Sequence, residues 1–369
     1  MKKVISLLLS MSLLLSACGA QGTNSGETTT APSSSVTESR ESTADTAEQT
    51  KEQPAEAQTT EGQPAERTKV NFGVLAGPTG MGAAKLWDDS KNGKSTNDYT
   101  MTLFGAPTDV APKLISKELD IAAVPTNLAA VLYQKTNGGV QLLALNTLGV
   151  LYLLTAEGES IHSIEDLKGK TVYSSGQAAV PEYVFNYILD AYGLKEEVTV
   201  IYEAEHDAVV AALAAGKAQI AVLPEPKVTA ALTQVKGLSL SLDLTKEWES
   251  AVAKKGDGDC LLSMGCVVVR KAFAEEHPEA VAAFLKEYEA SVNFMKDPAN
   301  MDAAAALCEA CGIIPKAAVA KKALPNCNLC LIAGTDMKTQ IAPFYEILFG
   351  FNPAAVGGKL PDDAFYYTK

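Results

Sequence analysis

From Val70 onward the chain alternates between short apolar runs and helical segments, and this alternation constrains the fold more than any other feature. The apolar runs are rich in Val, Ile and Leu and are too short for helices of ordinary length. They predict strands at 70–76, 100–104 and 121–124, and again at 171–174, 198–202 and 219–223. Strands that alternate with helices predict parallel sheets with helices on both faces.

The helical segments that follow these strands are expected at 80–91, 113–117, 126–132, 181–192 and 207–215. A further strand is expected at 262–269, after which the chain becomes mostly helical. The segment Pro278–Met295 places Val281, Phe284 and Tyr288 on one stripe, so it packs on a core. The fold class is therefore α/β with two lobes, each a mainly parallel sheet flanked by helices.

Composition excludes several classes of protein. The chain has 369 residues and a formal net charge of −13, whereas a nucleic-acid-binding protein needs basic surface to neutralise phosphates. No run of eighteen apolar residues follows the N-terminal region, so no multi-span membrane domain is expected. Only three histidines are present, which leaves few ways to build a histidine-based catalytic or metal site.

The N-terminal region has the pattern of a targeting segment. Lys2 and Lys3 precede an apolar run that is too short to span a bilayer comfortably. The run ends in Leu-Ser-Ala-Cys, which resembles the bacterial lipobox and implies cleavage of residues 1–17 and acylation of Cys18. An ordinary signal peptide with an incidental cysteine is the alternative. A lipid on Cys18 would hold the protein on the outer face of the bacterial cell membrane, in an extracytoplasmic location.

Residues 18–66 are expected to form a disordered, lipid-anchored tether. Sixteen of the 46 residues from Gln21 to Glu66 are Ser or Thr, and few are large and apolar. Nine acidic and two basic residues lie between Gly19 and Glu66, so about half of the net charge of the chain belongs to this segment. Repulsion between its acidic residues favours an extended linker between a membrane and a folded domain.

Four loops at predicted strand ends are candidates for ligand contact. In open α/β sheets, ligands bind at the carboxyl ends of strands, near helix N-termini. The loops combine backbone-permissive residues with short polar side chains: Gly77-Pro-Thr-Gly-Met-Gly82, Pro125-Thr-Asn127, Ser175-Gly-Gln177 and Pro224-Glu-Pro226.

Five sequence segments resemble a known family. They are the loop 77–82, DIAAVPTNLAA at 120–130, IEDLKGKTV at 164–172, AALAAGKAQIAVLPEP at 211–226 and HPEAVAAFLKEY at 277–288. Together they resemble type II solute-binding proteins of ABC importers, in the nitrate/sulfonate/taurine and NMT1/THI5-like (thiamine-precursor) group. The motifs identify the fold, but they do not identify the ligand.

The resemblance implies a lobe organisation and a set of partners. One lobe would comprise residues 69–152 plus 262–369 and the other residues 153–261, joined by two hinge strands near 147–154 and 261–268. The expected function is capture of a small solute between the lobes and its delivery to an ABC importer permease. The expected partners are that solute, the permease and, through the lipid, a membrane. A monomer without cofactor or nucleic acid is expected.

Two of the four loops follow strands of the first lobe. In the loop 77–82, the backbone N–H groups at Gly80 and Met81 and the Thr79 hydroxyl would face a ligand, or the loop is a plain turn and helix cap. Thr126 and Asn127 would bond the solute or cap the next helix.

The second lobe contributes further candidates, each with an alternative role. Gln177 has the same two interpretations as Asn127. Glu182 lies in a first helical turn, where a carboxylate is favourable in any case, and His206 stands just before a helix. Tyr152 would stack on a ligand or belong to a core. Glu225, between two prolines, would need a donor such as an amine in a dry cleft.

The solute itself is left open. No lysine or arginine occurs in the four loops, so nitrate or a sulfonate would depend on helix N-terminal N–H groups and hydroxyls. A neutral or amino-bearing heterocycle fits Glu182 and Glu225 somewhat better. Sulfonate, nitrate and pyrimidine or thiamine-precursor solutes all stay open.

Six cysteines remain after Cys18. The pairs Cys308/Cys311 and Cys327/Cys330 have the spacing of a four-cysteine zinc site, but the first pair is expected within a helix, where zinc knuckles normally use turns. Reduced thiols, disulfides and zinc stay open in that order, and no metal is expected.

Two other functions are alternatives to solute transport. A surface receptor or adhesin could use the same fold. A pyrimidine-precursor synthase-like enzyme with pyridoxal phosphate would need a Schiff-base lysine, for which Lys85 is the candidate. No Gly-x-Ser-x-Gly elbow is present, and no enzyme activity is expected.

Overall fold

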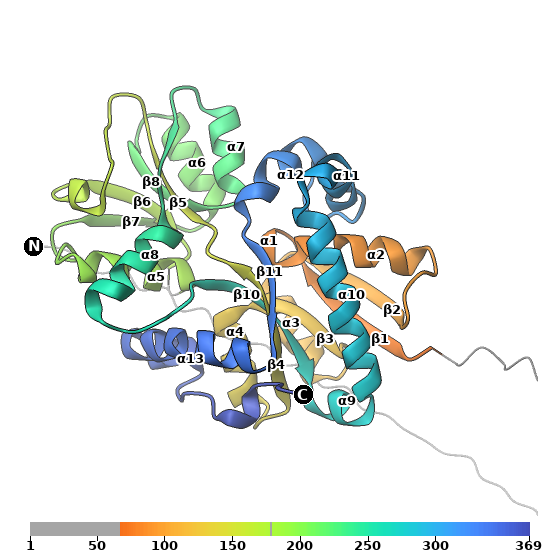
Figure 1. The fold of residues 1–369 in the computed structure, drawn as a ribbon. Helices are drawn as coiled ribbons and strands as arrows, with labels where there is room; N and C mark the ends of the chain where they lie inside the picture. The colour runs from red at the N-terminus through yellow and green to blue at the C-terminus, as the bar shows by residue number, and fades with distance from the viewer. Residues whose placement is uncertain (1–66, 178) are drawn as a thin grey trace, which may run out of the picture. The chain divides into compact units, whose positions relative to one another are not determined.

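Two mixed β-sheets flanked by helices organise the part of the chain that the computed structural model describes, residues 67–177 and 179–369 (Figure 1). Both sheets belong to one compact unit. The arrangement confirms the predicted α/β fold class. The signal peptide, Cys18 and the tether expected at 1–66 lie outside the described residues.

The first sheet has six strands in the order β11-β4-β10-β3-β1-β2. β1 pairs in parallel with β2 and β3, whereas β10 is antiparallel to β3 and β4, and β11 is antiparallel to β4. Four strands therefore run in one direction and two in the other. Their bounds are β1 Lys69–Leu75, β2 Asp98–Phe104, β3 Ile121–Pro125, β4 Val140–Leu148, β10 Ser263–Arg270 and β11 Leu329–Ala333.

The second sheet has five strands in the order β7-β6-β8-β5-β9. β6 pairs in parallel with β7 and β8, and β5 is antiparallel to β8 and β9. The bounds are β5 Leu151–Thr155, β6 Thr171–Ser175, β7 Thr199–Glu203, β8 Ile220–Pro224 and β9 Ser239–Asp243. Two residues separate β4 from β5, where the chain enters this sheet, and the chain returns to the first sheet at β10. The lobe boundaries at 152/153 and 261/262 stay predictions.

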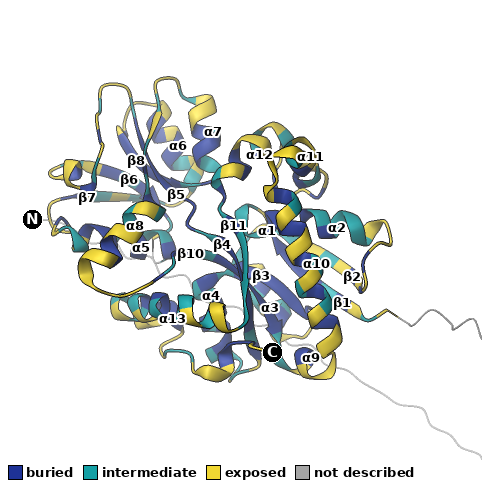
Figure 2. Cartoon of the chain, viewed as in Figure 1, coloured by how far each residue is buried: buried dark blue, intermediate teal, exposed yellow. Residues whose placement is uncertain are grey.

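Helices cover both faces of each sheet. In β8, Ile220 and Val222 pack with α5 and α8, whereas Ala221 and Leu223 pack with α6 and α7, as the twofold side-chain period of a strand requires. Figure 2 shows central strands such as β3 and β8 buried, and exposed residues on the outer faces of the helices and on loops. The longer helices are α2 Ala84–Lys91, α3 Pro107–Ile115, α4 Thr126–Lys135, α5 Val180–Ala191, α6 His206–Ala214, α7 Lys227–Gln234, α8 Leu244–Lys255, α10 Pro278–Lys296, α11 Met301–Ala310 and α13 Gly334–Phe351.

The predicted stripe on α10 is part of a buried core. Phe284 and Tyr288 stack at 5.3 Å between ring centroids, and Phe72 of β1 meets Phe284 edge-on at 5.1 Å. All three side chains are fully buried. This aromatic cluster fixes α10 on the first sheet, next to the loop that follows β1.

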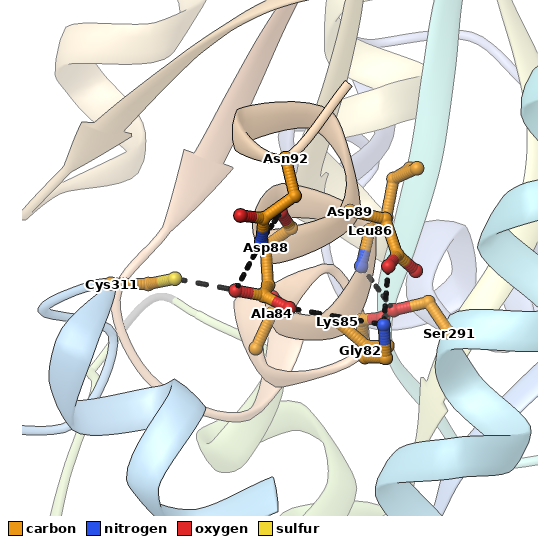
Figure 3. Close-up of polar contacts among 9 residues, drawn as sticks. All are labelled: Gly82, Ala84, Lys85, Leu86, Asp88, Asp89, Asn92, Ser291 and Cys311. Carbon is orange, nitrogen blue, oxygen red and sulfur yellow. Dashed lines mark hydrogen bonds and ion pairs between the residues drawn. The ribbon is translucent and has the colours of Figure 1, made fainter. Parts of the chain in front are cut away.

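The helix predicted at 80–91 is divided into α1 Pro78–Met81 and α2. The Ser291 hydroxyl of α10 donates to the Gly82 carbonyl at 2.6 Å and accepts the Leu86 N–H at 3.0 Å (Figure 3). It thus occupies the place of the direct Leu86-to-Gly82 bond that a continuous helix would form. A Cβ at position 82 would lie 3.0 Å from both Tyr288 and Val292, so glycine allows α10 to pack closely here.

Most predicted elements are present within a few residues of their expected bounds, but several were missed. β4 was anticipated only at its C-terminal end, and α7, β9 and α8 were not predicted. None of the helices in the described part of the chain combines the length and apolar character needed to cross a bilayer.

Candidate solute-binding site

A cavity of about 510 Å³ lies where loops from both sheets meet, and we call it the polar chamber. It is bounded by the loop after β1, the end of β4 and the loop after β8, so it occupies strand ends as the α/β rule predicts. Its lining residues are 76–79, Gly105, Thr147, Val150, Pro181, His206, 224–227, Met264 and 313–315.

A second cavity of about 610 Å³ adjoins the first and shares Pro181, His206 and Met264 with it. We call it the aliphatic chamber because most of its wall is Ala, Ile, Leu, Val, Met and Pro. The remaining lining residues are Pro107, Thr108, Ala111, Pro112, Ile115, Pro125, Asn127, Leu128, Leu132, Lys135, Gly176, Ala179 and Val180. Each cavity has the size of a small-molecule site.

A buried amide fixes the loop that carries Thr79. Asn146 of β4 donates one hydrogen bond to the Thr79 carbonyl at 2.8 Å and another to the Tyr288 hydroxyl at 3.0 Å. Gly77 begins the turn with φ at +93°, a conformation that favours glycine, and its N–H donates to the Ile313 carbonyl at 3.1 Å. The Thr79 side chain is therefore presented by a well-anchored loop.

His206 stands at the first position of α6 and lines both chambers. Its Nδ1 is hydrogen-bonded to the Ser175 hydroxyl at the end of β6. Burial, reinforced by nearby Lys227, lowers the pKa of the imidazole below its usual value. A neutral ring with Nδ1 engaged can offer Nε2 to a solute as a hydrogen-bonding group.

Glu225 lines the polar chamber but is 2% exposed, and protein donors surround its carboxylate. Oε2 accepts the Thr229 N–H at 3.1 Å, and Oε1 accepts the Thr229 hydroxyl at 2.9 Å and the Asn326 amide at 3.3 Å. Burial raises the pKa of Glu225, while these three bonds oppose the rise. The carboxylate thus holds the first turn of α7 and links this helix to the segment before β11.

Tyr152 meets the same segment from β5. Its hydroxyl donates to the Asn326 carbonyl at 2.8 Å, and burial raises its pKa above the usual range. Asn326 therefore contacts two of the predicted site residues at once, through its backbone and its side chain. Tyr152 is buried and is not among the residues that line either chamber.

The structure brings together four of the residues predicted from the loops. Thr79 and Glu225 line the polar chamber, Asn127 lines the aliphatic chamber, and His206 lines both. Asn127 also donates a long hydrogen bond, 3.4 Å, to the Ala355 carbonyl.

The other predicted residues do not line the chambers. Gly80 and Met81 are buried within α1, and the Thr126 hydroxyl bonds that of Ser263 at 2.9 Å. Gln177 is exposed, and Glu182 is half-buried in the first turn of α5. The proposal that these residues contact a solute stays a prediction.

Sequence reasoning missed Thr147, Lys227 and Met264. Lys227 lies two residues beyond Glu225 and pairs with Asp207 at 2.5 Å, so scanning one position past the predicted loop would have found it. Met264 lies near the start of β10, and no local signal shows that this strand reaches the chambers.

A larger cavity of about 880 Å³ lies elsewhere, between α5, α8 and α13. Four of its polar side chains bond in pairs: Lys255 pairs with Asp190 at 2.5 Å, and the Tyr187 hydroxyl donates to Asp257 at 2.5 Å. We place the candidate site in the two chambers because loops from both sheets converge there.

The cysteines do not form a metal cluster in the described part of the chain. No three His, Cys, Asp or Glu side chains within residues 67–177 and 179–369 come together in a group that could hold a metal ion. Cys308 lies in α11 and Cys311 caps its end, whereas Cys327 and Cys330 flank the start of β11. All six thiols from Cys260 to Cys330 are free, and burial raises the pKa of each.

Lys85, the candidate for a Schiff base, is engaged on the surface of α2. Its ammonium pairs with Asp89 and lies 3.9 Å from Asp88 (Figure 3). It also lies 5.5 Å from the centroid of the Phe294 ring, and it is not among the residues that line either chamber.

Comparison with known proteins gives one family and a set of structural neighbours. The family described as NMT1/THI5 like matches residues 104–301. No curated protein matches the chain.

The solved structures that the chain resembles include an ABC transporter structure and proteins named for sulfonate binding. An ABC transporter structure from Parabacteroides distasonis is 24% identical with a TM-score of 0.68, covering 82% of this chain and 99% of its own. The periplasmic aliphatic sulphonate binding protein SsuA from Escherichia coli is 15% identical with a TM-score of 0.63, covering 81% and 92%. A putative sulfonate-binding SsuA from Methylobacillus flagellatus KT is 16% identical with a TM-score of 0.59, covering 81% and 90%. These likenesses show the fold, which is that of periplasmic binding proteins.

Proposed function

The chain belongs to the NMT1/THI5-like family, and from that premise we propose that it is an extracytoplasmic substrate-binding lipoprotein of an ABC importer. It captures a small solute between its two lobes, 69–152 plus 262–369 and 153–261, and delivers it to the permease. Lobe closure about strands near 147–154 and 261–268 completes the capture.

The position of the polar chamber is the observation that carries this proposal. Thr79 reaches the chamber from the loop after β1 of the first sheet, and Glu225 and Lys227 reach it from the loop after β8 of the second. A solute held by both loops binds the closed arrangement more tightly than an open one, and this difference is what closure requires. The fold shared with periplasmic binding proteins supports the same conclusion.

Sulfonate, nitrate and pyrimidine or thiamine-precursor solutes are the classes that the resemblance suggests. The structural neighbours named for sulfonates are relatives in fold. Mass spectrometry of the solute released from gently purified protein identifies the class directly.

A pair of tryptophan variants tests the site. Gly105 lines the polar chamber and has no atom within 4 Å of a Cβ built on it, so Gly105→Trp places an indole in the chamber without a clash at Cβ. Gly350 has the same free space and lines the larger cavity of about 880 Å³. We expect Gly105→Trp to purify without solute and Gly350→Trp to retain it. Equal solute content in the two variants would contradict the proposed site.

Anchoring is tested separately at Cys18. We expect the full chain to incorporate radiolabelled fatty acid and to fractionate with membranes, and Cys18→Ser to be released into the medium. A Cys18→Ser protein that keeps its label and stays with the membrane would refute the lipid anchor.

A further inference from the structure

The aliphatic chamber is not needed for simple anion capture, yet it shares part of its wall with the polar chamber. The two cavities share Pro181, His206 and Met264, so a solute bound at His206 has access to both. A second space of about 610 Å³ beside the first exceeds the needs of a compact ion such as nitrate.

The wall of the aliphatic chamber selects against flat aromatic ligands. Ala111 and Ile115 of α3 and Leu128 of α4 line it, and four prolines make up much of the rest. No Phe, Tyr or Trp occurs among the described residues that line either chamber. The His206 imidazole is thus the one aromatic ring among the described lining residues, so stacking is limited to that side chain, whereas aliphatic carbons fit the rest of the walls.

The polar chamber offers hydrogen bonds without surplus charge. Lys227 is already paired with Asp207 at 2.5 Å, and Glu225 already accepts three hydrogen bonds. No arginine lines either chamber among the described residues, although arginine is the side chain best suited to sulfonate-like oxyanions, and the second lysine of the two walls, Lys135, lies at the far end of the aliphatic chamber's helix, in the last turn of α4. The Thr79 hydroxyl and the second ring nitrogen of His206 suit an uncharged polar group.

We propose that the solute is elongated, with an aliphatic segment of several carbons in the aliphatic chamber and an uncharged hydrogen-bonding end at His206 and Thr79. This inference rests on the proposed function, because it assigns the two ends of the solute that the binding protein captures. It makes Ala111, Ile115 and Leu128 specificity-determining residues for chain length.

A homologous series of probes tests the chain-length dependence. Straight-chain primary amides of two to eight carbons are titrated calorimetrically against the protein stripped of solute, beside alkanesulfonates and alkylammonium ions of equal length. Each buried methylene contributes about 0.8 kcal/mol, or about fourfold in affinity. We expect this increment over several carbons, a loss of the increment once the chamber is full, and weaker binding of both charged series at each length.

A filled chamber gives the matched test. Ala111 is half-buried on α3, so Ala111→Phe extends a ring into the aliphatic chamber, and Ala253→Phe adds the same ring to an exposed position of α8. We expect Ala111→Phe to abolish the chain-length increment while the shortest amides bind as before, and Ala253→Phe to match the parent protein.

The outcomes separate this inference from the proposed function. Amide affinity that does not change with length, or an unchanged increment in Ala111→Phe, overturns the aliphatic assignment. Sulfonates that bind more tightly than amides at every length overturn the uncharged end. Either result leaves the proposed function standing if Gly105→Trp still abolishes solute binding. Failure of every probe to bind, together with solute retention by Gly105→Trp, overturns both.

Discussion

Asn326 joins the segment before β11 to the second sheet, and its removal gives the sharpest test of how the two lobes are held together. Asn326→Ala deletes the amide that donates to Glu225 at 3.3 Å and leaves both Thr229 bonds and the backbone contact with Tyr152 in place. A hydrogen bond to a charged acceptor contributes about 1.5–3 kcal/mol, and this one is longer than the usual 2.9–3.0 Å. We expect the free energy of unfolding to fall by about 1–2 kcal/mol.

Asn300 supplies a control with the same chemistry at the surface. Its amide donates to the Asp297 carboxylate at the same distance, 3.3 Å, but in an exposed setting. Exposed pairs of this kind contribute little because water replaces them, so Asn300→Ala should change stability by less than about 0.5 kcal/mol. Urea denaturation followed through the fluorescence of buried Trp248 measures both variants. Equal losses in the two variants would refute the reasoning.

The charged variant adds a pH signature. Asn326→Asp places a second carboxylate near Glu225, and two unit charges at 3.3 Å repel by about 5 kcal/mol at an effective dielectric constant of 20. Burial already raises the pKa of Glu225, and the new charge raises it further. A carboxyl with a raised pKa in the folded state favours folding when protonated, so stability should fall as pH rises from about 4 to 7. The Asn300→Asp control should show a much weaker trend.

Three further outcomes follow from the structure. Arg270→Ala removes the guanidinium that pairs with the buried Asp120 carboxylate at 2.6 Å. We expect the free energy of unfolding, measured by urea denaturation, to fall by about 3–5 kcal/mol. Gly80→Ala places a Cβ 1.9 Å from the Leu75 carbonyl oxygen and should cost about 3 kcal/mol or more, whereas Gly105→Ala should be tolerated. Burial raises the pKa of Cys260 to about 12, so a thiol reagent should modify it only after denaturation; fast modification of the native protein would contradict this.

The fold class was predictable because the apolar pattern within each short segment indicates whether that segment is a strand or a helix. Buried strands such as Ile121–Pro125 are apolar on both faces, and the helices between them follow a 3.6-residue period. The strand order was not predictable. β4 lies between β10 and β11, which follow it by more than a hundred residues, and nothing in Val140–Leu148 encodes those partners.

The break between α1 and α2 shows a similar limit. The segment reads as one helix, but Ser291, about two hundred residues later, takes the place of one backbone hydrogen bond. Site prediction had the same limit: a loop at a strand end places its backbone near the cleft, but side-chain direction depends on the packing behind it. Thr79 and His206 line the chambers, while Gly80 and Met81 are buried within α1.

Glu225 shows how the structure changes a sequence argument whose physical premise was sound. A carboxylate in a dry cleft needs donors, and from the sequence alone this need favoured a solute that carries an amine. Thr229, four residues on, and Asn326, 101 residues on, supply those donors. Because the protein meets the need itself, the carboxylate no longer selects a cationic solute, and the apolar walls beside His206 become the stronger guide to what binds.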